Sequence, residues 1–220
     1  MKHEGSISSI FNDYMNVIAE ANNFPFYPFD LDGQDRYVCG DALFLSTDKF
    51  CIVEYKYTSN EISNENKKEK AVAVCLCLEG NDELKLLHDK CHYIAFESEE
   101  TLMANIYRNE VCNQKVLSGI TKLSSLQPMV SNRYHLHEFA KIFFTDTNMF
   151  SSLPEFKKYL KLLLSCGGGD EERELELVIN NYNDDRSGVK TKKVRSLLEA
   201  QKWVIKNYDQ KKELHKKLKF

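Results

Sequence analysis

The sequence has little that would place the chain in a membrane or give it one dominant charge. No run approaches the roughly 18 apolar residues of a membrane-spanning helix, and the N-terminal MKHEGSISSIF lacks the apolar core of a signal peptide. The formal net charge of −3 gives no overall basic excess for nucleic acid. The glycine run in SCGGGDEE lacks the Lys-Ser/Thr of a phosphate-binding loop. We expect a cytoplasmic protein, of a cell or of a virus replicating in one, with no membrane partner.

The composition is that of an ordinary globular protein. The 220 residues are 42% hydrophobic and 29% charged, and a chain of this length can bury a substantial core. Seven cysteines, an odd number mostly in apolar runs, predict reduced thiols that pack as small hydrophobes. No zinc is expected, because Cys75 and Cys77 are spaced more tightly than usual zinc ligands. The nearby His88, Cys91 and His92 are then best interpreted as a buried thiol and surface histidines.

The order of predicted elements divides the chain at about residue 98. A helix over 8–22 is predicted to bury the stripe Ile10, Tyr14, Val17, Ile18 and Ala21. An apolar hairpin, a helix in KAVAVCLCLEG, a short helix in LKLLHDK and a strand in CHYIAFES follow. Beyond these, helical spacing is predicted over 99–117, 134–147, 152–165, 170–183 and 189–218. We therefore expect an α/β core over 1–98 and a helical part over 99–220, either separate or packed on the core as one unit.

The stretch GDALFLSTDKFCIVEYKY, residues 40–57, is typical of a buried hairpin except for two acids and a lysine. A four-residue turn at 46–49 is predicted, since such hairpin loops are common. Side chains alternate across a strand, so this register places Asp41 opposite Glu54, with Lys56 on the same apolar face. Opposed like charges are destabilising, and a proton or a cation between them relieves the repulsion. Clustered oxygens suit a hard ion such as Mg²⁺, which makes Asp41 and Glu54 candidate metal ligands.

The pattern resembles that of the PD-(D/E)xK nuclease superfamily, the fold of many restriction endonucleases and Holliday-junction resolvases. Asp41 is followed after twelve residues by Glu54-Tyr55-Lys56 between apolar strands, and the resemblance covers residues 8–98. One departure is Gly40, where the family often has proline. The resemblance implies an α/β, restriction-endonuclease-like mixed sheet flanked by helices, here with a helical C-terminal part.

The resemblance also implies a chemistry, which is hydrolysis of phosphodiester bonds by a metal-dependent nuclease, with an endonuclease favoured. Asp41, Glu54 and the backbone carbonyl of Tyr55 would bind Mg²⁺, or Mn²⁺ in its place, and Lys56 would handle the attacking water. Some family members add a glutamate from the first helix, and Glu20 is the weaker candidate for that role.

Two groups of basic residues are candidates for contacts with a nucleic-acid backbone. They are Lys67, Lys68 and Lys70 after the hairpin, and Lys192, Lys193 and Arg195 in the basic C-terminal segment. A solvated surface is the competing interpretation for both groups. DNA is the expected substrate, RNA is left open, and so is a protein partner or a homodimer.

Three alternatives stay open at this point. The hairpin acids could simply line a solvated strand edge. The chain could be a catalytically silent nuclease-fold protein that acts as a nucleic-acid or protein interaction module. In the third alternative the helices of 99–218 bind a partner, and FKKYLKLLLS would then present an exposed apolar face.

Overall fold

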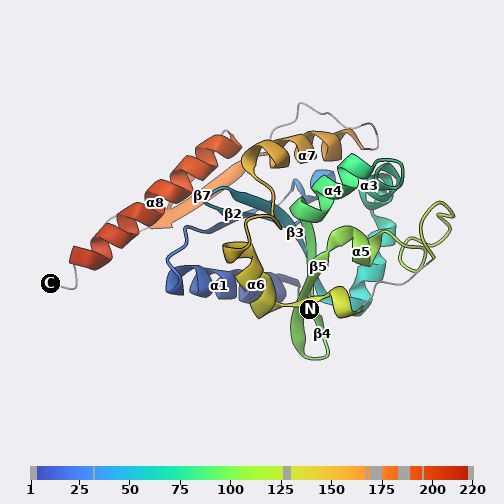
Figure 1. Cartoon of the computed structure of the whole chain (residues 1–220), viewed down its shortest axis with the longest axis horizontal. Coiled ribbons are helices and arrows are strands. Elements are labelled where there is room, and N and C mark those ends of the chain that lie inside the picture. Colours follow the sequence, from blue (N-terminus) through green and yellow to red (C-terminus); the bar gives the residue numbers. More distant parts are fainter. Residues whose placement is uncertain are drawn as a thin grey trace.

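The computed structural model describes residues 4–31, 33–125, 130–166, 168, 175–182, 189–194 and 196–217. In these ranges a mixed six-stranded sheet carries helices on both faces, and a separate two-stranded sheet precedes the last helix (Figure 1). The general α/β class predicted from the sequence is therefore confirmed. The elements are α1 (Glu4–Ala21), β1 (Tyr27–Asp30), α2 (Asp35–Val38), β2 (Ala42–Ser46), β3 (Lys49–Thr58), the 3₁₀ helix η1 (Ser59–Lys67), α3 (Glu69–Glu79), α4 (Asp82–Cys91), β4 (His92–Ser98), β5 (Thr101–Ile106), α5 (Tyr107–Val111), the 3₁₀ helix η2 (Val130–Asn132), β6 (Tyr134–His135), α6 (Leu136–Thr145), α7 (Leu153–Ser165), β7 (Leu177–Tyr182), β8 (Val189–Val194) and α8 (Leu197–Lys217).

The large sheet has its strands in sequence order, from β1 to β6. Only β3 and β4 run parallel, and η1, α3 and α4 form the crossover between them. A parallel pair needs such a long connection, whereas its antiparallel neighbours can be joined by short turns. β4 and β5 form a hairpin across residue 98, so the sheet continues past the predicted boundary.

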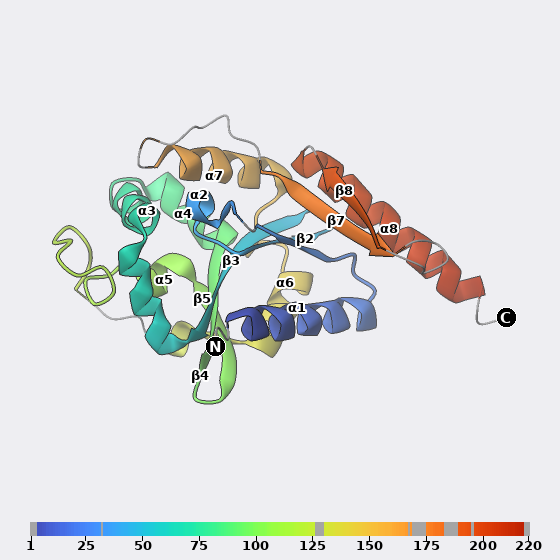
Figure 2. The ribbon, with the colours of Figure 1, turned by 180° about the vertical axis from the view of Figure 1, so that it is seen from behind.

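Alternating side chains divide the sheet into two buried faces. The face that carries Leu43, Ile52 and Ile94 packs against α3, α4 and α7, and the opposite face packs against α1 and α6 (Figures 1 and 2). Cover on both sides explains the nearly continuous apolar run in β3. Glu54 and Lys56, which lie within this run, are therefore carried into the interior.

The predicted helices at 8–22, 134–147 and 152–165 are confirmed as α1, α6 and α7, and the KAVAVCLCLEG helix as α3. Three other helical predictions are wrong over part of their length, and residues 170–174 and 183 of one of them lie outside the described residues. Residues 99–117 begin with strand β5, residues 170–183 contain strand β7, and residues 189–218 begin with strand β8. These strands are only six residues long, and over so few residues apolar spacing does not separate a strand from a helix.

The predicted apolar stripe of α1 is rotated away from the one that the helix buries. Ile10 and Val17 are 54% and 60% exposed. The buried row has four-residue spacing and consists of Ile7, Phe11, Met15 and Ala19. It packs on the β3 face that carries Tyr55. Side chains four apart lie on one helix face, so this row is as regular as the predicted one.

The hairpin has the predicted register but a shorter loop. Leu45 pairs with Phe50 and Leu43 with Ile52, as expected, and the ladder continues to a Ser46–Lys49 pair. The loop is therefore the two residues 47 and 48, not the four predicted. Shortening the loop symmetrically leaves every cross-strand partner unchanged.

The expectation of seven reduced thiols is wrong for one pair. Cys75 of α3 and Cys112 at the end of α5 form a disulfide, with their Cα atoms 5.2 Å apart, within the usual range of roughly 4.4–6.8 Å. Four of the remaining cysteines are buried, as predicted: Cys39, Cys51, Cys91 and Cys166. The disulfide ties α3 to α5, on the face of the sheet that holds the charged residues of β3.

Gly40 is needed where β2 approaches β3. A Cβ atom added at Gly40 would lie 2.0 Å from Ile52 Cγ2, which no side chain can tolerate without a shift. We predict that Gly40→Ala lowers the free energy of unfolding by about 1–3 kcal/mol through overpacking. Chemical denaturation measures this. Gly80→Ala is the matched control, because a Cβ there meets nothing within 4 Å, and an equal loss in both variants would contradict the close approach.

Candidate active site

The hairpin brings the predicted residues together on the inner face of β3. The last ladder pair of β2 and β3 is Ala42–Val53, so Asp41 follows at the position opposite Glu54. The Asp41 amide donates to the Val53 carbonyl at 2.9 Å, and the Tyr55 amide donates to Asp41 Oδ2 at 2.7 Å. The Asp41 carboxylate is thus fixed to the β3 backbone at the residue next to Glu54.

Two further charged residues enter from the segment after β3. Glu65 of η1 and Lys68, which precedes α3, complete with Asp41, Glu54 and Lys56 what we call the buried charge cluster. Glu54 Oε1 contacts the ammonium groups of both lysines, with Lys68 Nζ at 2.5 Å. Glu65 Oε1 lies 3.0 Å from each ammonium nitrogen.

Burial makes the cluster electrostatically demanding. Glu54 and Glu65 are 1% and 0% exposed and Lys56 is 5% exposed, whereas the Lys68 side chain is 36% exposed. Three carboxylates and two ammonium groups leave one negative charge in surplus. Desolvation penalises an isolated charge strongly in such a site, so the surplus has to appear as a perturbed pKa or attract a cation.

Glu54 carries that perturbation. Burial, and then the nearby Asp41 charge, raise the pKa of Glu54 to about 7, despite the opposing lysines. Burial would also raise the pKa of Glu65, but Lys56, Lys68 and a hydrogen bond from Tyr107 lower it instead. The Tyr107 hydroxyl donates to Glu65 Oε2 at 2.6 Å. The two glutamates therefore differ because Asp41 adjoins one and Tyr107 the other.

One oxygen in the cluster is buried without a partner. Glu54 Oε2 accepts no hydrogen bond from any described residue. Glu65 Oε1 also lacks hydrogen-bonding geometry, although both ammonium groups lie close to it. A buried carboxylate oxygen usually has a partner, so Glu54 Oε2 is a position at which a cation or a donor would lower the energy.

The remaining predicted site residues lie elsewhere. Glu20 is exposed and lines a pocket with Trp203 and Tyr208, so the structure does not bring it together with the buried charge cluster. The Tyr55 side chain points to the opposite face, where its hydroxyl donates to Asn12 Oδ1 at 2.7 Å. The ligand role proposed for the Tyr55 carbonyl stays a prediction.

Most of the basic residues that were predicted to contact nucleic acid have partners within the chain. Lys68 points into the charge cluster, and Lys70 donates to backbone carbonyls at the end of α7, including Cys166 O at 2.7 Å. Both side chains have partners within the chain, and their proposed contacts with nucleic acid stay predictions. Lys67 is exposed and donates to Asn64. The exposed Lys192 and Lys193 pair with Glu199 and Glu176 respectively, and Arg195 lies outside the described residues.

Glu65 and Tyr107 were not among the site residues predicted from the sequence. The one signal available was the spacing of Glu65 and Lys68. Residues three apart lie above one another in a 3₁₀ helix, so both can point in the same direction. Nothing local to Tyr107 indicates that its hydroxyl reaches Glu65.

Comparisons with protein-family models, curated proteins and solved structures find no match for this chain. Across the described part of the chain, none of the helices is both long and apolar enough to cross a bilayer. The geometry of the site therefore has to carry the functional argument.

We predict that Glu54→Gln changes how stability depends on pH. The pKa of Glu54 is raised from 4.5 to about 7 by folding, so its stabilising contribution is full below pH 4.5 and is lost as the pH rises towards 7. Relative to the unmodified chain, the variant should gain about 3 kcal/mol over this window. Denaturation at closely spaced pH values tests this.

Glu155→Gln is a control in which the effect of pH on stability should have the opposite sign. Its hydrogen bond from Lys90 lowers the pKa of Glu155, so this variant should be the less stable one at neutral pH and recover as the pH falls below 4.5. A pH profile for Glu54→Gln parallel to that of the unmodified chain would contradict the raised pKa.

Proposed function

We propose that the chain is a metal-dependent nuclease that hydrolyses phosphodiester bonds, most simply in DNA, with the site at Asp41, Glu54 and Lys56. The observation that carries the proposal is the surplus negative charge beside the unpartnered Glu54 Oε2. A divalent cation at the two carboxylates would neutralise this charge. The order of elements supports the assignment, since a helix, three antiparallel strands, helices and a strand parallel to the third fit a restriction-endonuclease-like core.

The donor set fits Mg²⁺ or Mn²⁺. Oxygen ligands are what these hard ions prefer, and Asp41 and Glu54 supply carboxylate oxygens. Among the residues that the structure describes, no group of three or more histidine, cysteine, aspartate or glutamate side chains is placed to hold an ion. The metal would therefore rest on Asp41, Glu54, the Tyr55 carbonyl and water. Once bound, it would polarise a phosphate oxygen and lower the pKa of a water ligand.

Lys56 has the position and the restraint that its proposed role requires. Its ammonium is held by Glu54 and Glu65 at the inner side of the site, and both carboxylates raise the pKa of Lys56 against the effect of burial. A permanently charged, oriented ammonium can stabilise charge that develops on a phosphoryl group, or hold a water. Lys68 is its more exposed counterpart, on the solvent side of the same two carboxylates.

A specific observation favours the alternative of a catalytically silent protein on the same fold. Both glutamates are almost fully buried, and each already lies within contact distance of two lysines. By contrast, α7 gives no support to a helical interaction module built on FKKYLKLLLS, because five apolar side chains of this stretch are buried and the sixth, Leu162, is partly buried. The five are Phe156, Tyr159, Leu160, Leu163 and Leu164. A protein partner, a homodimer and a cytoplasmic location remain predictions.

Cleavage assays distinguish the two functions. We predict that supercoiled DNA, and to a lesser extent linear DNA, is cut with Mg²⁺ or Mn²⁺ and not with EDTA, with RNA as a parallel substrate. Asp41→Asn, Glu54→Gln and Lys56→Met should each lower the rate on the order of 100-fold to 1,000-fold, because each removes a charge from the reacting centre.

Glu83→Gln and Lys158→Met are the matched controls, since these two residues form an exposed ion pair of the same chemical type. Both control variants should cut at the unmodified rate. Metal-dependent cleavage that survives all three site substitutions would place the site elsewhere. A folded chain that cuts none of the substrates would instead support the silent alternative.

A further inference from the structure

Two histidines and a tyrosine form a fully buried polar chain behind the charge cluster. His88, His92 and Tyr159 are each 0% exposed. The Tyr159 hydroxyl lies 2.9 Å from His88 Nδ1 and 2.7 Å from His92 Nδ1. His92 Nε2 lies 2.7 Å from the backbone carbonyl oxygen of Cys39. The sequence had predicted surface histidines here, and that prediction is wrong.

The direction of every hydrogen bond in this chain can be derived from its last acceptor. The Cys39 carbonyl can only accept, so His92 Nε2 carries the proton and donates to it. His92 Nδ1 must then accept, which makes Tyr159 its donor. The Tyr159 oxygen in turn accepts from His88 Nδ1–H, and His88 Nε2 is left as a lone pair.

Two observations agree with this assignment. His88 Nε2 is indeed buried without a partner among the described residues. Burial lowers the pKa of His88, and it lowers the pKa of His92 to about 4 despite the hydrogen bond to Cys39. Both rings are therefore neutral near pH 7, as the derived tautomers require.

The chain ends on the turn that places Asp41. Cys39 has a φ of 53°, in the left-handed region that residues other than glycine seldom adopt, and Gly40 packs against Ile52. Such a conformation persists only where neighbouring contacts hold it. The hydrogen bond from His92 is one of these contacts, and two residues further on Asp41 Oδ2 accepts from the Tyr55 amide.

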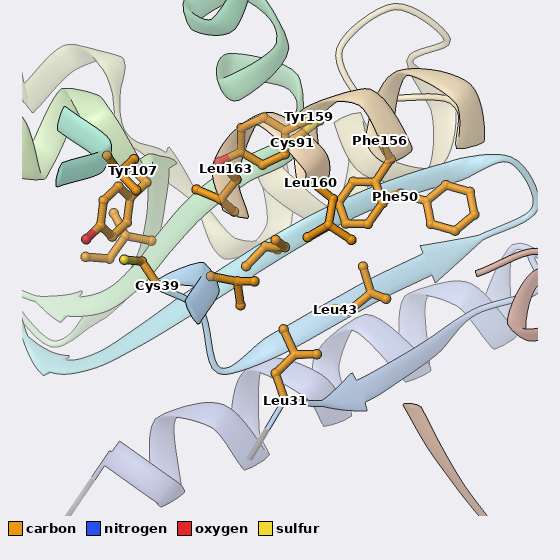
Figure 3. Close-up of a cluster of buried hydrophobic side chains, with 14 of the residues drawn as sticks. Leu31, Cys39, Leu43, Phe50, Cys91, Tyr107, Phe156, Tyr159, Leu160 and Leu163 are labelled. Carbon is orange, nitrogen blue, oxygen red and sulfur yellow. The ribbon is translucent and has the colours of Figure 1, made fainter. Parts of the chain in front are cut away.

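His92 also touches the residue that holds the second carboxylate. The Tyr107 ring stacks on the His92 ring with centroids 4.5 Å apart, and the Tyr107 hydroxyl donates to Glu65. Figure 3 shows Cys39, Tyr107 and Tyr159 in one cluster of buried side chains, contributed by three separate segments of the chain. A single imidazole thus contacts the supports of two carboxylates.

We infer that His92 is the positioning residue of the site, which holds the Cys39–Asp41 turn in place while Tyr159 fixes the tautomer that allows it to do so. The metal-binding part of this inference rests on the proposed function, which makes Asp41 a metal ligand. The positional part does not, because it concerns the carboxylate and the Tyr55 amide alone.

Four variants separate positioning from general packing. His92→Met removes the donor but fills the space, and His92→Gln keeps a side-chain N–H near the position of Nε2. Tyr159→Phe removes only the hydroxyl that fixes the tautomer. His88→Leu is the control, because it replaces a histidine of equal burial whose ring makes no hydrogen bond to Cys39. Thermal unfolding shows whether each variant is folded.

The first readout needs no metal. The amide proton of Tyr55, in the NMR spectrum of the labelled chain, reports its hydrogen bond to Asp41 Oδ2. We expect His92→Met and Tyr159→Phe to move this resonance upfield, and His92→Gln and His88→Leu to leave it near its original position. An unmoved resonance in folded His92→Met or in Tyr159→Phe would overturn the inference. If His92→Met does not fold, Tyr159→Phe decides alone.

The second readout is the affinity for Mn²⁺ alone, measured by calorimetry. Residues that orient a ligand typically contribute about 10-fold to 100-fold to metal affinity. We expect a loss in that range for His92→Met, recovery in His92→Gln, and a change within about twofold for His88→Leu. An equal loss in His88→Leu would indicate packing and contradict the inference. If the unmodified chain binds no Mn²⁺, the proposed metal site fails, and the Tyr55 resonance still decides the positional claim.

Discussion

Charge on β3 has to be neutralised inside the protein, because apolar layers cover both faces of this strand. Glu54 and Lys56 lie at the level of the core, where an unpaired ion is far more costly than at the surface. The pair neutralises itself, but Asp41, which directly precedes β2, adds a second carboxylate. The segment after β3 supplies further charged groups to the same place. Glu65 of η1 contacts Lys56, and Lys68, which follows η1, contacts Glu54. The crossover to β4 is thus shaped by electrostatics as well as by packing.

Stability alone gives no reason for this arrangement. Buried ion networks can often be replaced by apolar residues without loss, and a network built for stability would balance its charges. Here burial, and then the Asp41 charge, raise the energy of ionised Glu54, and both raise the pKa of this residue. Strongly perturbed groups held close together are typical of functional sites. Glu54, whose ionised form is the least favourable charge in the cluster, is therefore the residue that most strongly supports the proposed cation.

The sequence was sufficient for the hairpin and insufficient for its surroundings. Period-two alternation fixes which side chains share a face, so the pairing of Leu43 with Ile52 and the position of Asp41 followed from spacing. The error in loop length was harmless, because a symmetric change preserves register. Glu65, Lys68 and Tyr107 reach the site through the path of η1, α3 and α5, and no local pattern encodes that path. The short strands β5, β7 and β8 were mistaken for helices for a related reason, since their identity depends on the partner strand.

The two buried histidines show where composition misleads most. A histidine beside lysine and aspartate, as in HDKCHY, is most often solvated, and the segment alone favours that interpretation. His92 is buried because it begins β4, the strand parallel to β3, and its ring then lies beneath the Cys39 turn. Its tautomer is set by Tyr159, 67 residues further along the chain. Buried polar atoms require a hydrogen-bond partner in most cases, and both ring nitrogens of His92 have one. The same requirement that hides His92 from sequence analysis makes its direction of donation derivable, and that direction leads to Asp41.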